Sequence, residues 1–223
     1  MFHIPPIPIQ LLLQNEENGN NNAMQGNPAK CKDTQFRYCQ VQFNTMLNIP
    51  GNADWTNPSI LGNALQNLIQ TQGVVGINSL CKAYRSFSAC LGSRYNSCFN
   101  ILYFLGHNYK ITDAYAYLNI MHQSHFFCGA GFQTFISNYK CFFATQQAAN
   151  GQLQLCGQAF TNGTIAHPSQ VCQYLETLTK CVSKPFYQAC GKTTGWASCE
   201  SQRVGLQPAF PQCTNTRCYI NTH

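Results

Sequence analysis

The stretch CQYLETLTKCVSKPFYQAC, from Cys172 to Cys190, decides the fold that the sequence predicts. Its three cysteines recur at steps of nine residues. The His167-Pro168-Ser169 sequence before it suits the start of a helix. Apolar side chains then follow at helical spacing, which predicts an amphipathic helix: Val171, Tyr174, Leu175, Leu178 and Val182.

A similar stretch, CKAYRSFSACLGSRYNSC, runs from Cys81 to Cys98. In both stretches a tyrosine, Tyr95 or Tyr187, stands three residues before the last cysteine. The pattern C-x3-F also occurs twice, at Cys39 and at Cys128. All these matches are offset by about 90 residues, which predicts two tandem helical modules, residues 31–110 and 111–223, produced by duplication.

Helix geometry restricts how these cysteines can pair. Nine residues of α-helix turn through about 900° and rise about 13 Å, which places the two ends on opposite faces. Disulfide-bonded cysteines need α-carbons within about 7 Å of each other. Cys172 therefore cannot bond to Cys181, nor Cys81 to Cys90, and each must attach its helix to a different neighbour.

If duplication produced the modules, the four matched cysteines of each module should pair among themselves. Two topologies satisfy this rule: Cys39–Cys81 with Cys90–Cys98, or Cys39–Cys90 with Cys81–Cys98. A helical segment from Cys90 to Cys98 would span about 12 Å, which favours the second. The expected bonds are Cys39–Cys90, Cys81–Cys98, Cys128–Cys181 and Cys172–Cys190. The unmatched cysteines should then pair among themselves, with Cys141–Cys156 as one bond, and a bond between a matched and an unmatched cysteine would contradict the two-module account.

The rest of the chain also predicts helices. The clearest runs from Pro58 to Gln72, with Asn57 as its cap and Gly73 just past its end. Its apolar face is Ile60, Leu61, Ala64, Leu65, Leu68 and Ile69. Two more are expected over residues 113–127 and 131–149, the latter ending before an Asn150-Gly151 turn. Alternation of strand type is short throughout, so the predicted fold class is an all-α, disulfide-stapled helical domain.

The cysteine content indicates an oxidising compartment. The chain of 223 residues has 14 cysteines and no C-x2-C pair of the kind that holds a structural metal ion. We therefore expect a secreted, extracellular protein in which every cysteine forms a disulfide: Cys31, Cys39, Cys81, Cys90, Cys98, Cys128, Cys141, Cys156, Cys172, Cys181, Cys190, Cys199, Cys213 and Cys218.

Charge and hydropathy exclude two classes of partner. Only 9% of the residues are charged, and the 13 basic residues behind the net charge of +6 form no cluster that would attract nucleic acid. No apolar run approaches the roughly 20 residues of a membrane span.

The first 30 residues are predicted to form a disordered, Asn-rich leader. Residues 1–13 are apolar but contain three prolines and no Lys or Arg, unlike an ordinary signal peptide. We expect either a degraded signal region or a true start that lies upstream.

Several motifs together resemble secreted cysteine-rich domains that are expanded in nematodes. They are Phe127-Cys128, the L-x-x-C-V that ends at Val182, the C-G-x4-W from Cys190 to Trp196, and the P-x-C that ends at Cys213. These domains include ones of unknown function and ones similar to the chondroitin proteoglycan core. The resemblance covers about residues 31–218 and implies an extracellular protein without catalytic residues. The chain has no Ser-Gly dipeptide, which a chondroitin chain needs for attachment.

Few residues suggest chemistry. His122, His125 and Cys128 have a spacing that a zinc site could use, but an oxidised Cys128 would leave only two ligands. We expect no metal, no cofactor and no catalytic residue, so the chain is predicted not to be an enzyme. Asn162-Gly163-Thr164 is a glycosylation sequon, expected in a loop between Cys156 and Cys172.

The sequence leaves two functions open. The first is a secreted structural or protein-binding module of extracellular matrix, cuticle or body fluid, with an unknown extracellular protein or glycan as its partner. The second is an extracellular carrier that binds a lipid or other apolar small ligand between its helices. The aromatic residues, 13% of the chain, would fill the core in the first case and line a pocket in the second.

Overall fold

The computed structural model describes residues 30–219, and these are all-α, with no β-strand among them. The predicted fold class is confirmed, whereas the predicted N-terminal leader up to residue 29 lies outside the described residues. The α-helices are α2 (Asp33–Leu47), α3 (Pro58–Gln72), α4 (Val74–Leu91), α5 (Tyr95–Cys98), α6 (Ile101–Gly106), α7 (Ile111–Cys128), α8 (Phe132–Ala148), α9 (Asn150–Ala166), α10 (Val171–Cys190) and α11 (Lys192–Leu206).

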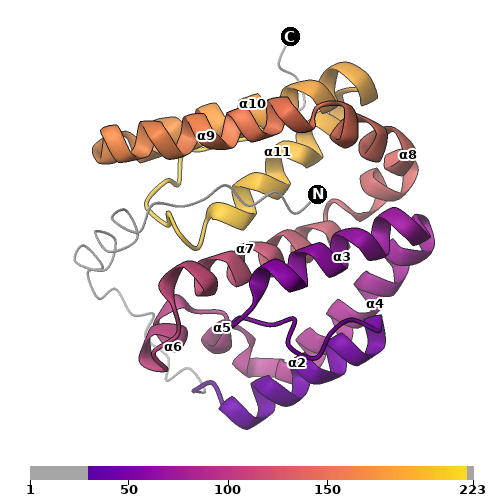
Figure 1. Cartoon of the computed structure of the whole chain (residues 1–223), viewed down its shortest axis with the longest axis vertical. Helices are drawn as coiled ribbons and strands as arrows, with labels where there is room; N and C mark the ends of the chain where they lie inside the picture. The colour runs from indigo at the N-terminus through magenta and orange to yellow at the C-terminus, as the bar shows by residue number, and fades with distance from the viewer. Residues whose placement is uncertain (1–29, 220–223) are drawn as a thin grey trace.

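The helices form two groups that meet along α7 (Figure 1). In the first group α4 packs against α2 and α3, and α7 covers α3 and α4. In the second group α10 packs against α8, α9 and α11. Helix α11 also packs against α7, so the two groups share one continuous core.

Helix α3 has the predicted bounds, Pro58–Gln72. Its predicted apolar face is buried at Leu61, Leu65 and Ile69. The predicted cap differs in detail: the Asn57 side chain donates to Thr56 Oγ1, while the Asn57 backbone carbonyl accepts from the N–H groups of Ile60 and Leu61. Hydrophobic periodicity is therefore enough to place this helix.

The helix expected over residues 131–149 is confirmed as α8, but the turn expected at Asn150-Gly151 is wrong. Helix α8 ends at Ala148 and α9 begins at Asn150, so both residues of the dipeptide are helical. The physical reason is burial, because Leu153, Cys156 and Phe160 stand at helical spacing and all enter the core. Packing of this stripe outweighs the local turn preference of Asn-Gly.

All fourteen cysteines are paired, in seven disulfides that connect different elements of the chain. The bonds are Cys31–Cys98, Cys39–Cys90, Cys81–Cys128, Cys141–Cys190, Cys156–Cys181, Cys172–Cys213 and Cys199–Cys218. The geometric exclusions hold, because no two cysteines of one helix bond to each other.

Of the five predicted bonds, Cys39–Cys90 is confirmed and the other four are wrong. The matched Cys98 bonds to the unmatched Cys31, which contradicts the two-module account in its register of about 90 residues. The boundary between residues 110 and 111 stays a prediction, and Cys81–Cys128 crosses it. This bond forms because α7 packs against α4 of the first group.

The disulfides relate the two groups in a different register. Cys39–Cys90 joins α2 to the end of α4 with a sequence separation of 51, and Cys141–Cys190 joins α8 to the end of α10 with a separation of 49. These bonds are equivalent in topology, and they correspond to an offset of about 100 residues. The offsets of about 90 and about 100 residues differ by about one nine-residue step. Cysteines repeated at that step can therefore be aligned at either offset, and the spacing alone does not identify the correct one.

Aromatic side chains fill the cores of both groups. Phe36 and Trp55 stack with ring centroids 4.5 Å apart in the first group, and Phe142 and Phe186 stack at 4.5 Å in the second. All four side chains are at most 4% exposed. These rings therefore contact each other within the core.

Candidate functional site

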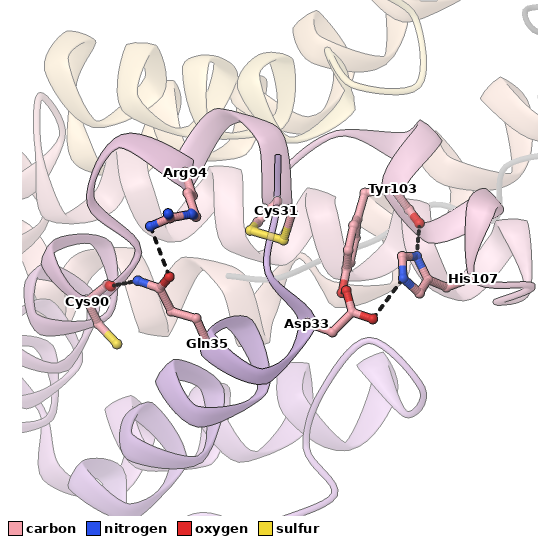
Figure 2. Close-up of a disulfide and its surroundings, with 8 residues drawn as sticks. Cys31, Asp33, Gln35, Cys90, Arg94, Tyr103 and His107 are labelled. Carbon is pink, nitrogen blue, oxygen red and sulfur yellow. Dashed lines mark hydrogen bonds and ion pairs between the residues drawn. A yellow bond between two sulfur atoms is a disulfide. The ribbon is translucent and has the colours of Figure 1, made fainter. Parts of the chain in front are cut away.

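A cluster of polar and ionisable side chains lies at the start of α2, beside the Cys31–Cys98 disulfide (Figure 2). Asp33 is its centre: Oδ1 accepts a hydrogen bond of 3.1 Å from the Tyr103 hydroxyl, and Oδ2 lies 2.9 Å from His107 Nε2. The other ring nitrogen of His107, Nδ1, lies 2.7 Å from the backbone carbonyl oxygen of Tyr103. This cluster connects the start of α2 to α6.

The geometry of His107 indicates a structural role. Both of its ring nitrogens face oxygen atoms that accept hydrogen bonds, a carboxylate and a carbonyl, so the complete set of bonds needs both N–H groups. A catalytic base needs a free ring nitrogen directed at a nucleophile. Burial, and after it the charge of Asp33, raises the pKa of Tyr103, which keeps that hydroxyl protonated as a donor.

A second group of hydrogen bonds lies on the other side of the same disulfide (Figure 2). Gln35 Nε2 donates a 2.6 Å hydrogen bond to the backbone carbonyl of Cys90, and Arg94 Nη1 donates to Gln35 Oε1 at 3.2 Å. The Arg94 charge thus lies near the carbonyl end of α4, where the helix dipole favours a cation. Together the hydrogen bonds around Asp33 and those around Gln35 hold α2 against α4 and α6.

The three residues considered for zinc do not form a metal site. Cys128 is oxidised, as expected, although its partner is Cys81. The His122 ring packs 6.3 Å from the Phe99 ring, and the His125 ring packs 5.9 Å from that of Tyr84. Within residues 30–219, no three His, Cys, Asp or Glu side chains gather as metal ligands would.

His122 predicts a pH-dependent stability. Burial, and after it the nearby His125, lowers the pKa of His122 from 6.5 to about 4. The unfolded chain therefore binds a proton below about pH 6.5 that the folded chain takes up only near pH 4. The free energy of unfolding should fall as the pH drops through this window, by roughly 2–3 kcal/mol from this residue.

Urea unfolding at pH 7 and pH 4.5 checks this prediction. The His122→Gln variant should lose less stability between the two pH values than the natural chain. The exposed His167→Gln variant is the control and should behave as the natural chain does. An equal pH dependence in all three proteins would contradict the role of His122.

Asn162 lies in α9, and the prediction of a loop there is wrong. Its side chain is exposed, but the rest of the sequon is packed. Thr164 is 0% exposed, and its hydroxyl donates to the carbonyls of Phe160 and Thr161. A Cβ at Gly163 would lie 2.3 Å from the Tyr174 ring, so α9 and α10 are in close contact at this sequon.

We expect a glycan to reach Asn162 only before α9 packs, because a glycosyltransferase must reach the Thr164 hydroxyl as well as the asparagine. In secretory cells, a brief pulse of reductant that delays disulfide formation should raise site occupancy. Intact mass measurement reads this directly, and Asn162→Gln should remove the added mass. Equal glycosylation in vitro of the folded and the reduced protein would contradict the prediction.

The hollow between α8, α10 and α11 is small. It has a volume of ≈ 20 Å³ and is lined by apolar groups such as Phe142 and Val182 together with the amides of Gln146 and Gln202. Roughly one water molecule needs this much room. A larger hollow of ≈ 510 Å³, between the ends of α4 and α7 at Tyr84, Arg85 and His125, is open to solvent.

The sequence did not predict the hydrogen bonds around Asp33 and Gln35. The partners in these contacts lie 55 to 74 residues apart, and no local spacing signals them. Comparison of the chain with protein-family models, with curated proteins and with solved structures gave no match. The resemblance to nematode-type cysteine-rich domains therefore stays a hypothesis.

Proposed function

We propose that this chain is a secreted structural or protein-binding module of extracellular matrix, cuticle or body fluid, without catalytic activity. The observation that carries the proposal is the pairing of all fourteen cysteines across different parts of the fold. Disulfides form and persist in oxidising compartments and are rare where thiols are kept reduced. Seven of them are compatible with an extracellular protein.

Two further features support this proposal. The cluster of Asp33, Tyr103 and His107 uses its histidine and carboxylate in contacts between the start of α2 and α6. No helix in the described part of the chain has the length and apolar character needed to cross a bilayer. The partner we propose is an extracellular protein or glycan.

The carrier hypothesis needs a specific kind of space. A site for a lipid or another apolar ligand has a volume of roughly 300–1,000 Å³ and apolar walls. The hollow between α8, α10 and α11 has ≈ 20 Å³, and the rings of Phe142 and Phe186 stack against each other there. The hollow of ≈ 510 Å³ beside Tyr84 reaches that volume, but it is open to solvent, and Arg85 and His125 lie in its lining. These observations favour the structural module.

Native mass spectrometry of the protein purified from extracellular fluid tests the proposal. The mass should be lower by fourteen hydrogens than that of the reduced chain, with no retained lipid or other apolar ligand. A fully reduced protein recovered from the cytosol would overturn the proposed compartment, and a co-purifying lipid released only on unfolding would favour the carrier.

A further inference from the structure

The segment that follows α11 forms a recess with α10 and α11. Two disulfides fix this segment, Cys172–Cys213 to α10 and Cys199–Cys218 to α11. The recess has a volume of ≈ 210 Å³. Because crosslinks hold its walls, a ligand would pay little ordering entropy on binding there.

The recess has an apolar side and a cationic side. Leu175 of α10 and Phe210 form the packed base of the apolar side and are at most 2% exposed, and the exposed Pro211 supplies its accessible apolar surface. Arg203 and Arg217 line it as well. Thr214 adds a hydroxyl group to the same lining.

The charges of this recess are not balanced. Nε and Nη2 of Arg203 both contact a single oxygen of Glu200, Oε2, at 2.8 and 2.7 Å. Arg217 is exposed and forms no hydrogen bond or ion pair with the described residues. Of the two guanidinium groups in the recess, only that of Arg203 therefore has a carboxylate partner, in a chain with only 7 acidic residues to compensate 13 basic ones.

The shape and the charge indicate one class of ligand. A guanidinium group binds carboxylate and sulfate groups through two parallel hydrogen bonds. A cavity of roughly 150 Å³ is enough to bind benzene, so this recess has room for one ring. We propose that the recess binds an organic anion of one ring, with its carboxylate or sulfate on Arg217 and its ring against Pro211.

The anion has two sources, a free ring carboxylate or a uronate or sulfated sugar at the end of an acidic glycan. Titration of the full-length oxidised protein with benzoate, glucuronate and inorganic sulfate, followed by calorimetry and by amide NMR shifts, distinguishes them. Saturable binding of benzoate with shifts at Thr214 and Arg217 identifies a free ring carboxylate, and tighter binding of glucuronate identifies the sugar. Either result supports the recess as a site.

The Arg217→Gln variant should weaken binding by at least about tenfold, the loss typical of a charged hydrogen bond. Arg217→Lys keeps the charge but loses the planar fork, so its affinity should lie between the two. Arg85→Gln is the matched control, since it removes an exposed arginine that lies over the Phe132 ring in another part of the fold. Its affinity should stay within about twofold of the natural chain.

Three results would overturn the proposal. The first is a linear response to both ring anions with no saturation. The second is an equal affinity of the Arg217→Gln and Arg85→Gln proteins. The third is binding of inorganic sulfate as tight as that of benzoate and glucuronate, because charge alone would then explain the binding. All these variants alter exposed residues, so each is expected to fold.

Discussion

Reduction of the seven disulfides should unfold this chain. Each disulfide typically contributes about 2–4 kcal/mol, and the net stability of a domain is only about 5–15 kcal/mol. The bonds enclose 19 to 67 residues, and together they restrict the unfolded chain over residues 31–128 and 141–218. In excess reductant at 37 °C, far-ultraviolet circular dichroism should show loss of the cooperative helical transition. A cooperative helical fold that persists under these conditions would refute the account of the disulfides as the main stabilisers.

Single bonds allow a sharper test. In the chain-entropy description, the bond that closes the longer loop stabilises more. Replacing Cys81 and Cys128 by alanine opens a separation of 47 residues that no other disulfide shortens, whereas replacing Cys199 and Cys218 opens one of 19. The first pair of substitutions should cost about 1 kcal/mol more in free energy of unfolding than the second. The reverse order in urea unfolding would show that native contacts at each bond, and not loop entropy, set its contribution.

The helices could be predicted because their signal is local. In α3 the residues Leu61, Leu65 and Ile69 repeat at helical spacing, and burial of that face is what stabilises the helix. In α9 the same kind of signal was present at Leu153, Cys156 and Phe160, yet the Asn-Gly dipeptide suggested a turn. The stripe has three buried side chains to stabilise it, and the dipeptide has only a local preference.

The disulfide partners could not be predicted in the same way. Helix geometry excluded pairs within α4 and α10, and it supported Cys39–Cys90. The partner of Cys81 depends on where α7 packs, and no spacing in the sequence reports this. The hydrogen bonds around Asp33 also depend on tertiary packing, because His107 reaches Asp33 only after α2 and α6 have packed together.

The candidate anion recess shows a further limit of sequence reasoning. Arg203 and Arg217 are separated in sequence by the turn that carries Phe210, and two isolated arginines in a basic chain carry no motif. Their common recess exists because two disulfides hold the segment after α11 against α10 and α11. The functional hypothesis for this region therefore depends on these disulfides. The sequence predicted Cys190 as the partner of Cys172, whereas Cys172 bonds to Cys213.

Replacement of Phe36 by alanine should be the most damaging single substitution in the first helix group. Phe36 is 0% exposed and stacks on Trp55 at 4.5 Å. It also makes edge contacts with Tyr103 at 5.5 Å and with Phe104 at 6.0 Å. Loss of a buried phenylalanine costs about 3–5 kcal/mol, because apolar burial is lost and a cavity remains. The lost aromatic pairs add to this cost.

Tyr38, two residues further along α2, provides the matched control. Its ring is 59% exposed, and its hydroxyl accepts a hydrogen bond from Gln42 on the surface. Tyr38→Ala should change the free energy of unfolding by no more than about 0.5 kcal/mol. Urea unfolding of the two oxidised variants at pH 7 measures the difference. Similar losses in both would mean that the ring cluster around Phe36 contributes no more than an exposed side chain, and that the crosslinks alone hold α2 in place.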